Sequence, residues 1–485
     1  MIFQIYKFLL LSIGINLIAL PLKGQFRFAA DFRAKNTEVC KTLESFAKIP
    51  GLKGSSWGLA IVNPKDGKFL AEKSAADNFI PASNMKIITS LNAFHHLGED
   101  YRFSTDFYIS GSLKDSVLYG NIWISGGGDP TPGMEGRDRL NSDFFGQAIR
   151  LLKSRGIKSI KGRLIQIPCE NPYHGLRSTW SWGDLSQSYG AGIYALNANE
   201  NQFHIYADAI TKDSIAVIKR ADSLFSQMNL SGLKIKTGPP GSNDDSYFSW
   251  KPGSSKINLT GTIPPSSETQ RLRGAIPDPE QFFLDLLKHE LWKGGVMVRD
   301  SIVEDQPGQK IGEIKSPPLS QIIKEVNQHS NNFYTEALAF ALCRKGDSGS
   351  DYGWTHLNRI KSVVSMPEGY YLSDGSGLSP TNRLSPAGIT KALSWALKQK
   401  WSETFLSSLP VAGESGTMKN FCTGACGKIR AKSGTLNRTL CYSGYAETAS
   451  GKVIFSMMIN NYHGGQKSMK EEMGKVLESF VKIRH

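Results

Sequence analysis

The two ends of this chain carry regular secondary-structure patterns that complement each other. Near the start, residues 37–48 have helical periodicity, and the apolar run WGLAIV is followed by the turn Asn63–Gly67 and a second short run, which is a β-hairpin pattern. Near the end, three strand-like runs (KIRAKSG, LCYSGYAET and KVIFSMMINNY) precede a helical pattern over 466–484. These patterns predict one α/β domain whose two halves are separated by a long insertion.

The stretch between these halves has a different character. Short strands alternate with turns from about residue 101, and residues 170–270 are rich in Ser, Gly and Asn. A length of 485 residues suggests two or three domains. We therefore expect residues 25–100 and 305–485 to form the discontinuous α/β domain. Residues 101–304 are expected to form two smaller, mostly β domains, one nested in the other. Helical patterns are found near 141–154 and over 279–294, 318–328 and 333–343.

The N-terminus holds the only long apolar run of the sequence. Lys7 precedes the apolar segment Phe8–Leu22, which has the length of a signal-peptide core and is broken by Pro21 and Gly24. We interpret residues 1–24 as a secretory signal peptide; the alternative is an uncleaved anchor. The mature chain is then expected to be exported to the periplasm or cell envelope, without a stable transmembrane segment. A polytopic membrane protein is excluded.

The chain is basic, with a formal net charge of +14. This charge suits an exported protein that works near an anionic envelope surface, although a generally basic surface for solubility explains it equally well. The sequence contains no zinc finger, RNP motif or concentrated Arg/Lys run. We therefore expect no nucleic-acid partner.

Six cysteines occur, at positions 40, 169, 343, 422, 426 and 441. An exported chain can form disulfides, but the sequence does not select a pairing. Cys422 and Cys426 have the spacing of a metal-binding pair, yet a second pair and a His cluster are missing nearby. A local disulfide or free thiols are favoured over a metal site, and no metal or organic cofactor is expected.

A serine nucleophile needs a base, and the sequence offers Lys rather than His for this task. None of the nine histidines accompanies a GxSxG nucleophile elbow. In the pattern S-x-x-K, serine and lysine lie one helical turn apart on the same face, so the amine can reach the hydroxyl. The pattern occurs four times, at Ser45/Lys48, Ser83/Lys86, Ser231/Lys234 and Ser479/Lys482. Only Ser83 is expected at the start of a helix, where the helix dipole favours an oxyanion.

Two further patterns complete a set that the S-x-x-K motif accompanies in some serine acyl-transferases. S-x-N occurs at Ser90–Asn92, too far along the Ser83 helix to meet Ser83, and at Ser330–Asn332, in a predicted turn between helices. Lys-Thr-Gly occurs at 236–238, where two prolines follow and argue against a central strand. Lys432-Ser433-Gly434 lies on the first of the terminal strands, and serine keeps the hydroxyl of threonine. We therefore select 330–332 and 432–434.

With these three motifs in this order, the chain resembles the penicillin-recognising serine acyl-transferases. More narrowly, it resembles the class C low-molecular-weight penicillin-binding proteins, the D-alanyl-D-alanine carboxypeptidase/endopeptidase family (peptidase family S13). The resemblance covers nearly the whole mature chain. The segments that carry it are SGGGDPTP (125–132), ALNANEN (195–201), DGSGLSPTN (374–382), LPVAGESGTM (409–418) and RAKSGTL (430–436).

This resemblance implies a role for each matching residue. Ser83 would attack the carbonyl between two D-alanines, and Lys86 would act as the neutral general base, with its pKa depressed by Lys432. Ser330 would relay the proton to the leaving amine, and Asn332 would hold Lys86 and a substrate carbonyl. On the terminal strand, Lys432 and Ser433 would bind the terminal carboxylate, and Gly434 would line the substrate site. The backbone N–H groups of Ser83 and Thr435 would form the oxyanion hole.

The resemblance also implies a fold and a function. The fold would be a β-lactamase/transpeptidase-like α/β domain, with a central antiparallel sheet and helices, split by the insertion. The activity would be that of a serine-type D-Ala-D-Ala carboxypeptidase on peptidoglycan stem peptides, with DD-endopeptidase activity on cross-bridges as an option and β-lactam antibiotics as inhibitors. Two alternatives stay open: a β-lactamase or esterase of the same fold, and a non-catalytic scaffold that binds the cell wall. The DGSGLS segment is expected to be a structural loop near the site.

Overall fold

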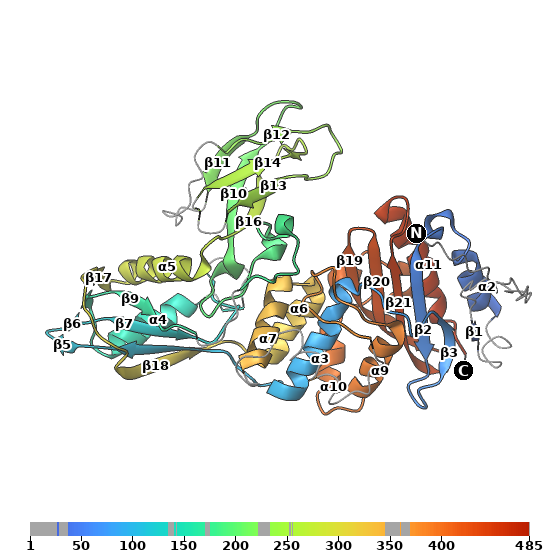
Figure 1. Ribbon diagram of the computed structural model, residues 1–485, viewed down its shortest axis with the longest axis horizontal. Helices are drawn as coiled ribbons and strands as arrows, with labels where there is room; N and C mark the ends of the chain where they lie inside the picture. The colour runs from blue at the N-terminus through green and yellow to red at the C-terminus, as the bar shows by residue number, and fades with distance from the viewer. Residues whose placement is uncertain are drawn as a thin grey trace, which may run out of the picture.

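The computed structural model describes residues 27–28, 37–133, 140–141, 143–169, 175–221, 233–251, 254, 256–344, 359 and 369–484. The predicted signal peptide, residues 1–24, lies outside the described residues. The described chain forms an α/β part that contains both ends, and an insertion that extends away from it and carries a projecting lobe (Figure 1).

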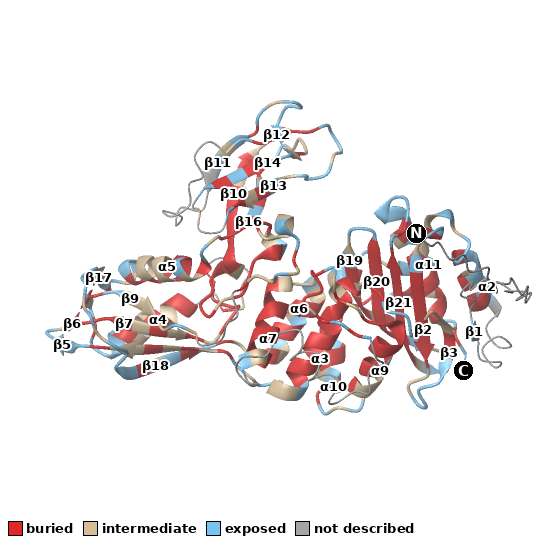
Figure 2. Cartoon of the chain, in the orientation of Figure 1, coloured by how far each residue is buried: buried red, intermediate tan, exposed pale blue. Residues whose placement is uncertain are grey.

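A central antiparallel sheet forms the core of the α/β part. Within the described residues its order is β1-β3-β2-β21-β20-β19, so the N-terminal strands form one half of the sheet, the C-terminal strands form the other, and the halves meet where β2 pairs with β21. Their bounds are β1 Arg27–Phe28, β2 Ser56–Val62, β3 Phe69–Lys73, β19 Ile429–Leu436, β20 Thr439–Thr448 and β21 Gly451–Asn460. Nearly every residue of β2, β20 and β21 is buried, because helices cover both faces of the sheet (Figure 2).

Two groups of helices cover this sheet. One face carries the terminal helices α2, Thr37–Phe46, and α11, Gln466–Phe480, whose apolar residues share one core with the sheet. The other group lies between the sheet and the insertion (Figure 1). It consists of α3 Met85–Leu97, α6 Leu319–His329, α7 Asn332–Arg344, α9 Pro386–Ala396 and α10 Ser402–Ser408.

The first lobe of the insertion contains two small sheets and two helices. The described strands are ordered β18-β4-β7-β9 in one sheet and β17-β8-β6-β5 in the other. The bounds are β4 Ser104–Ile109, β5 Ser112–Lys114, β6 Val117–Tyr119, β7 Ile122–Gly126, α4 Phe144–Ser154, β8 Ser159–Lys161, β9 Leu164–Gln166, α5 Pro279–Lys293, β17 Met297–Arg299 and β18 Gln309–Lys315. Helices α4 and α5 contribute Phe144 and Phe283 to its core.

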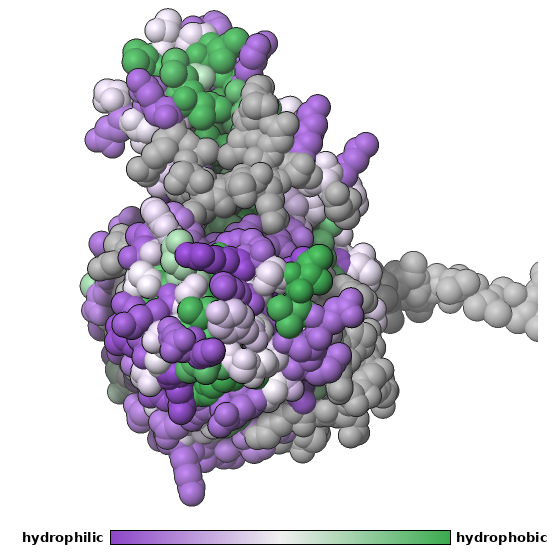
Figure 3. Space-filling model, turned by 90° about the vertical axis from the view of Figure 1, so that its left-hand side faces the viewer, coloured by the Kyte–Doolittle hydropathy of each residue, from purple (hydrophilic) through white to green (hydrophobic). Residues whose placement is uncertain are grey.

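The second, projecting lobe interrupts the first one in the sequence. We call it the nested lobe, residues 202–275, and it is built of short strands. They are β10 Gln202–Asp208, β11 Val217–Ala221, β12 Lys236–Thr237, β13 Tyr247–Trp250, β14 Ile257–Thr260, β15 Thr262–Ile263 and β16 Gln270–Ala275. Seen from the far end of the insertion, hydrophobic residues gather on this lobe above a mainly hydrophilic surface (Figure 3). Exposed Ile210, Ile215 and Val217 belong to this lobe.

The predicted fold class, an antiparallel central sheet with helices and a β-rich insertion, is confirmed. The expected boundary at residue 304 differs from the strand pairing. Strand β18 pairs with β4 from Gln309 opposite Ile109 to Lys315 opposite Ser104, so residues 309–315 complete a sheet of the insertion. In the described residues, no helix is both long and apolar enough to cross a membrane.

Candidate active site

Ser83 lies in a single 3-10 turn, η2 Ala82–Asn84, that continues directly into α3. Lys86 follows one turn later, and its Nζ donates a hydrogen bond to Ser83 Oγ at 3.0 Å. The lysine side chain is fully buried, whereas Ser83 is only partly buried. The S-x-x-K pattern therefore places a hydroxyl near the surface with an amine directly behind it.

Two further oxygens hold the Lys86 amine in place. Asn332 Oδ1, at the first residue of α7, and the backbone carbonyl of Ser376 each accept a hydrogen bond from Nζ at 2.6 Å. The Asn332 contact matches the role implied by the sequence resemblance. The Ser376 carbonyl was missed, because a backbone acceptor leaves no signal in the residue type.

The pKa of Lys86 is lowered from 10.5 to about 7, mainly because burial disfavours the charged amine. The carboxylates of Asp374 and Glu336 oppose this effect and raise the pKa. We had attributed a lowered pKa to the nearby Lys432 cation, and that cause is wrong: burial dominates. Electrostatic repulsion by Lys86 instead contributes to the lowered pKa of Lys432. The burial of the Lys432 side chain has the larger effect on that pKa. A substantial fraction of Lys86 is therefore a neutral amine near pH 7.

Ser330 occupies the junction between two helices. Helix α6 ends at His329, Ser330 has a left-handed backbone conformation with φ of 54°, and α7 begins at Asn332. Ser330 Oγ accepts a hydrogen bond from Lys432 Nζ at 2.8 Å. The sharp turn thus places the serine hydroxyl toward β19 and the asparagine amide toward Lys86.

Strand β19 forms the edge of the central sheet that borders this group. Lys432 Nζ donates to the Ser433 carbonyl at 2.7 Å, and Ser433 Oγ donates to Thr417 Oγ1 at 2.8 Å. The N–H of Ala431 points away from β20, since it donates to the Pro410 carbonyl at 3.0 Å. Backbone direction alternates along a strand, so the N–H of Thr435 points to the same open side.

Gly434 lets this strand approach the Ser83 turn. A Cβ added to Gly434 would lie 2.9 Å from the Pro81 carbonyl oxygen and 3.0 Å from the Ser83 backbone nitrogen. Such distances are shorter than van der Waals contact, so a side chain here would separate the strand from the turn. The absence of a side chain at Gly434 therefore brings the backbone N–H groups of Ser83 and Thr435 to the same side of the site.

Two buried carboxylates support the site from behind. Asp374, in the segment DGSGLS, accepts hydrogen bonds from the backbone N–H groups of Gly377 at 2.8 Å and Ser379 at 2.6 Å, and from side chains. Glu336, on α7, accepts from the N–H groups of Gly375 and Ser376. The predicted structural role of DGSGLS is confirmed, because these bonds fix the loop whose Ser376 carbonyl holds Lys86.

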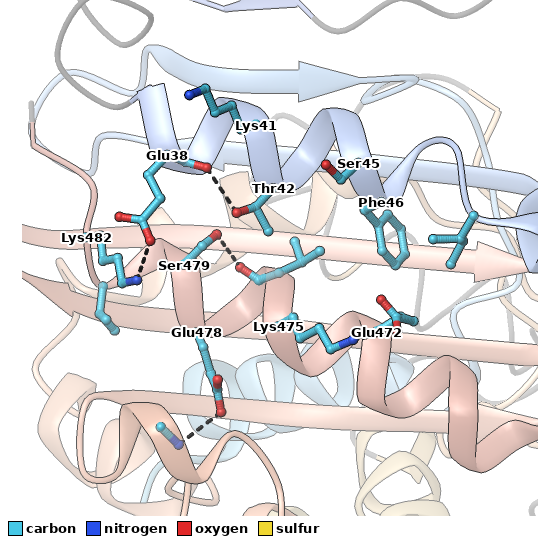
Figure 4. Close-up of a pocket in the computed structure, with 14 residues that line it drawn as sticks. Glu38, Lys41, Thr42, Ser45, Phe46, Glu472, Lys475, Glu478, Ser479 and Lys482 are labelled. Carbon is cyan, nitrogen blue, oxygen red and sulfur yellow. Dashed lines mark hydrogen bonds and ion pairs between the residues drawn. The ribbon is translucent and has the colours of Figure 1, made fainter.

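Of the other three S-x-x-K pairs, two lie away from this site, and the serine of the third lies outside the described residues. Ser45 and Ser479 line a groove of about 520 Å³ between α2 and α11, on the opposite face of the sheet (Figure 4). Lys482 forms an ion pair with Glu38 at 2.6 Å, and Ser479 Oγ donates to the Val476 carbonyl. The amphipathic pattern of the two terminal helices predicts that both pairs lie on solvated faces; Ser45 is exposed, whereas Ser479 is buried, so this prediction is wrong for Ser479. Ser231 lies outside the described residues.

The literal Lys-Thr-Gly motif lies in the nested lobe. Lys236 and Thr237 form β12, which pairs with β15 rather than with the central sheet. Cys169, Cys422, Cys426 and Cys441 are free thiols. Among the residues that the structure describes, no group of three or more His, Cys, Asp or Glu side chains has the geometry to hold a metal ion. The structure thus brings together Ser83, Lys86, Ser330, Asn332 and Lys432, the residues selected from the motifs.

Comparison with known proteins agrees with this geometry. The chain is 26% identical over 474 residues to a D-alanyl-D-alanine carboxypeptidase from Actinomadura, covering 93% of this chain and 86% of that one. It is 22% identical over 470 residues to D-alanyl-D-alanine carboxypeptidase DacB from Haemophilus influenzae, covering 94% of this chain and 95% of that protein.

Among solved structures, penicillin binding protein 4 (dacB) from Haemophilus influenzae superposes with a TM-score of 0.76 at 22% identity, covering 92% of this chain and 99% of that one. The same protein has also been solved in complex with a β-lactam. The D-Ala-D-Ala carboxypeptidase 3 (S13) family model matches residues 39–479. Since the match spans nearly the whole described chain, this protein belongs to the D-Ala-D-Ala carboxypeptidase 3 (S13) family.

Proposed function

We propose that this protein is a serine-type D-Ala-D-Ala carboxypeptidase that acts on peptidoglycan stem peptides. The observation that carries the proposal is the contact between Ser83 Oγ and the buried Lys86 amine, 3.0 Å apart, with the lysine pKa lowered to about 7. A lysine that is partly neutral at physiological pH can remove the serine proton, whereas an ordinary lysine cannot. Membership of the S13 family supports the choice of substrate.

The acylation step follows from this contact. Ser83 Oγ attacks the carbonyl carbon between the two D-alanines, and its proton passes to Lys86 Nζ. The backbone N–H groups of Ser83 and Thr435 stabilise the oxyanion that develops. The proton that Lys86 has accepted is then relayed through Ser330 to the leaving amine, the C–N bond breaks, and free D-alanine departs. Asn332 holds Lys86 throughout, through the 2.6 Å hydrogen bond to its amine.

The peptide terminus is bound by β19 in this proposal. Lys432 and Ser433 receive the terminal carboxylate, and Gly434, which has no side chain, keeps this strand close to the Ser83 turn. Water then attacks the ester carbonyl, and Lys86 accepts a proton from this water. Lys86 returns the proton to Ser83 Oγ as the ester C–O bond breaks, and the peptide leaves one residue shorter. If the leaving amine belongs to a neighbouring stem peptide instead of to free D-alanine, the same steps describe DD-endopeptidase cleavage of a cross-bridge.

We also propose that the protein works outside the cytoplasm. The support is the apolar segment Phe8–Leu22 after Lys7, together with a substrate class that lies in the cell wall. N-terminal sequencing of the protein from the envelope fraction tests this: a start near Gln25 is expected, and an intact Met1 in the cytoplasmic fraction would contradict it.

The activity is tested by D-alanine release and by labelling with a fluorescent penicillin, each beside Ser83→Ala. The parent is expected to release D-alanine from a peptide ending in D-Ala-D-Ala and to keep a stable label, and the variant to do neither. A label that disappears rapidly would instead indicate a β-lactamase. Folded parent protein that takes no label would favour the non-catalytic scaffold.

A further inference from the structure

The Asn332 carboxamide makes two hydrogen bonds, one as an acceptor and one as a donor. Its Oδ1 accepts a hydrogen bond from Lys86 Nζ at 2.6 Å, and its Nδ2 donates to the backbone carbonyl of Tyr189 at 2.9 Å. A carboxamide has one acceptor end and one donor end. If the amide turned over, Oδ1 would face the Tyr189 carbonyl, so that two acceptors would meet, and the hydrogen bond that Lys86 Nζ donates would be lost. The Tyr189 carbonyl therefore selects the orientation that presents an acceptor to Lys86.

Tyr189 belongs to the insertion, not to the α/β part. It lies in what we call the bridging loop, residues 182–190, which contains the short turns η3 Trp182–Asp184 and η4 Ser188–Gly190. The loop is closely folded on itself: a Cβ added to Gly190 would lie 1.9 Å from the Asp184 carbonyl oxygen. The position of the Tyr189 carbonyl is therefore set by the backbone of this loop.

The nested lobe holds the bridging loop from one side. Gln187 Nε2 donates to the Phe248 carbonyl on β13 at 2.7 Å, and Ser186 Oγ donates to the same carbonyl. The Ser186 carbonyl accepts from the Ala275 N–H on β16 at 2.9 Å, next to a β-bridge between Gln187 and Gly274. Ser186 and Gln187 are both buried. These contacts fasten the loop to β13 and β16 of the nested lobe.

The α/β part holds the chain just before the loop. Trp180 Nε1 donates to Asp374 Oδ2 at 2.8 Å, and Arg177 forms an ion pair with buried Glu336 at 3.5 Å. These are the carboxylates that raise the pKa of Lys86. Trp180 and Arg177 thus connect the insertion to the two buried carboxylates near Lys86. Tyr189 connects the insertion to Asn332.

From these contacts we infer that the bridging loop is a positioning element of the active site, and that the nested lobe acts on acylation by holding it. The Tyr189 carbonyl fixes the Asn332 amide, and Asn332 in turn holds the Lys86 amine against Ser83. This inference rests on the proposed function, because it assigns the loop to the acylation step. The nested lobe thus affects the acylation rate indirectly, through the bridging loop.

The test weakens the hold of the nested lobe on the bridging loop without changing a motif residue. Gln187→Ala deletes the hydrogen bond to Phe248 and should slow penicillin acylation about tenfold, because a small displacement of a catalytic group costs rate. The control is Gln270→Ala, in the same lobe, whose Nε2 donates to the Pro264 carbonyl at the same 2.7 Å but which is not bonded to the bridging loop. Thermal unfolding of both variants shows whether the fold is retained. If Gln187→Ala does not fold, Ser186→Ala replaces it, since it deletes the other side-chain hydrogen bond to the Phe248 carbonyl.

A double-mutant cycle with Asn332→Ala separates positioning from general loosening. If the loop acts through Asn332, Gln187→Ala has no further effect on the slow acylation of the Asn332→Ala protein. Equal losses in both backgrounds, or a Gln187→Ala rate equal to that of the parent, would overturn the inference while the parent is still labelled. A parent that takes no label would instead overturn the proposed function, and the inference with it.

Discussion

Lys86 and Asn332 are separated by 246 residues in the sequence, yet the lysine amine donates to the asparagine Oδ1 at 2.6 Å. Lys86 comes from the helix that precedes the insertion, and Asn332 from the helix that follows it. The hydrogen bond therefore joins the two halves of the α/β part at the point where the proposed chemistry takes place. The strength of this hydrogen bond depends on the protonation state of Lys86 and on the orientation of the Asn332 amide.

Replacement of Lys86 by alanine should abolish acylation. The variant loses the group proposed to take the Ser83 proton, and loss of a general base typically costs on the order of 10² to 10⁴-fold in rate. The measurement is the rate of fluorescent-penicillin labelling, with circular dichroism as the check of fold. Lys482→Ala is the matched control, since Lys482 belongs to another S-x-x-K pair and contacts Glu38 instead. Unchanged labelling of Lys86→Ala would exclude this lysine as the base.

The acylation rate should rise with pH through a midpoint near 7. Only the neutral form of Lys86 can accept the proton, and this form gains population as the pH passes a pKa of about 7. Since the Glu336 carboxylate raises this pKa, Glu336→Gln should move the midpoint to lower pH. A pH series of labelling rates on both proteins measures this. A midpoint that stays in place or moves to higher pH would contradict the assignment.

Replacement of Gly434 by alanine should slow acylation more than it destabilises the fold. Gly434→Ala places a Cβ 3.0 Å from the Ser83 nitrogen, so strand and nucleophile must separate. We expect acylation to slow on the order of 10²-fold, as for other small displacements of catalytic groups. Gly465→Ala is the control, because a Cβ there meets nothing within 4 Å and φ is −77°. Equal labelling rates for the two variants would show that the close approach is unimportant.

The Ser433 hydroxyl should contribute to peptide turnover. Ser433→Ala removes a donor proposed to bind the substrate carboxylate, and a hydrogen bond to a charged group is worth about 1.5–3 kcal/mol. This corresponds to a loss of at least tenfold in kcat/KM for D-alanine release. Ser433→Thr keeps the hydroxyl and should stay close to the parent. If alanine and threonine behave alike, the hydroxyl does not bind the carboxylate.

The side chains of the site were predictable from the sequence, and their supports were not. Ser83, Lys86, Ser330, Asn332 and Lys432 were found because each motif combines functional side chains at fixed spacing. The carbonyls of Ser376 and Tyr189 are backbone groups that any residue type would supply, so only the fold reveals them. Glu336 gave no signal either, because a glutamate within a helix is usually exposed.

The fold, too, was predictable from the sequence only in part. The halves at the two ends were predictable because the helical and strand patterns are long there, and α5, predicted over 279–294, spans Pro279–Lys293. The predicted end of the insertion at 304 missed β18, whose sequence QKIGEIK has only two apolar side chains and shows little apolar alternation. Its strand conformation depends on pairing with β4, a contact between distant parts of the chain.

The pairing of β2 with β21 in the middle of the central sheet has a consequence for how the protein is made. A growing polypeptide contains Ser83, Lys86 and the complete insertion before β19, β20 and β21 have been synthesised, yet β2 pairs with β21 from Ser56 opposite Asn460. Pairing over such a sequence separation is late in folding. The nucleophile therefore acquires its neighbours on β19 only after translation is almost complete, so that unfinished chains and fragments lacking the C-terminal strands should be chemically inert.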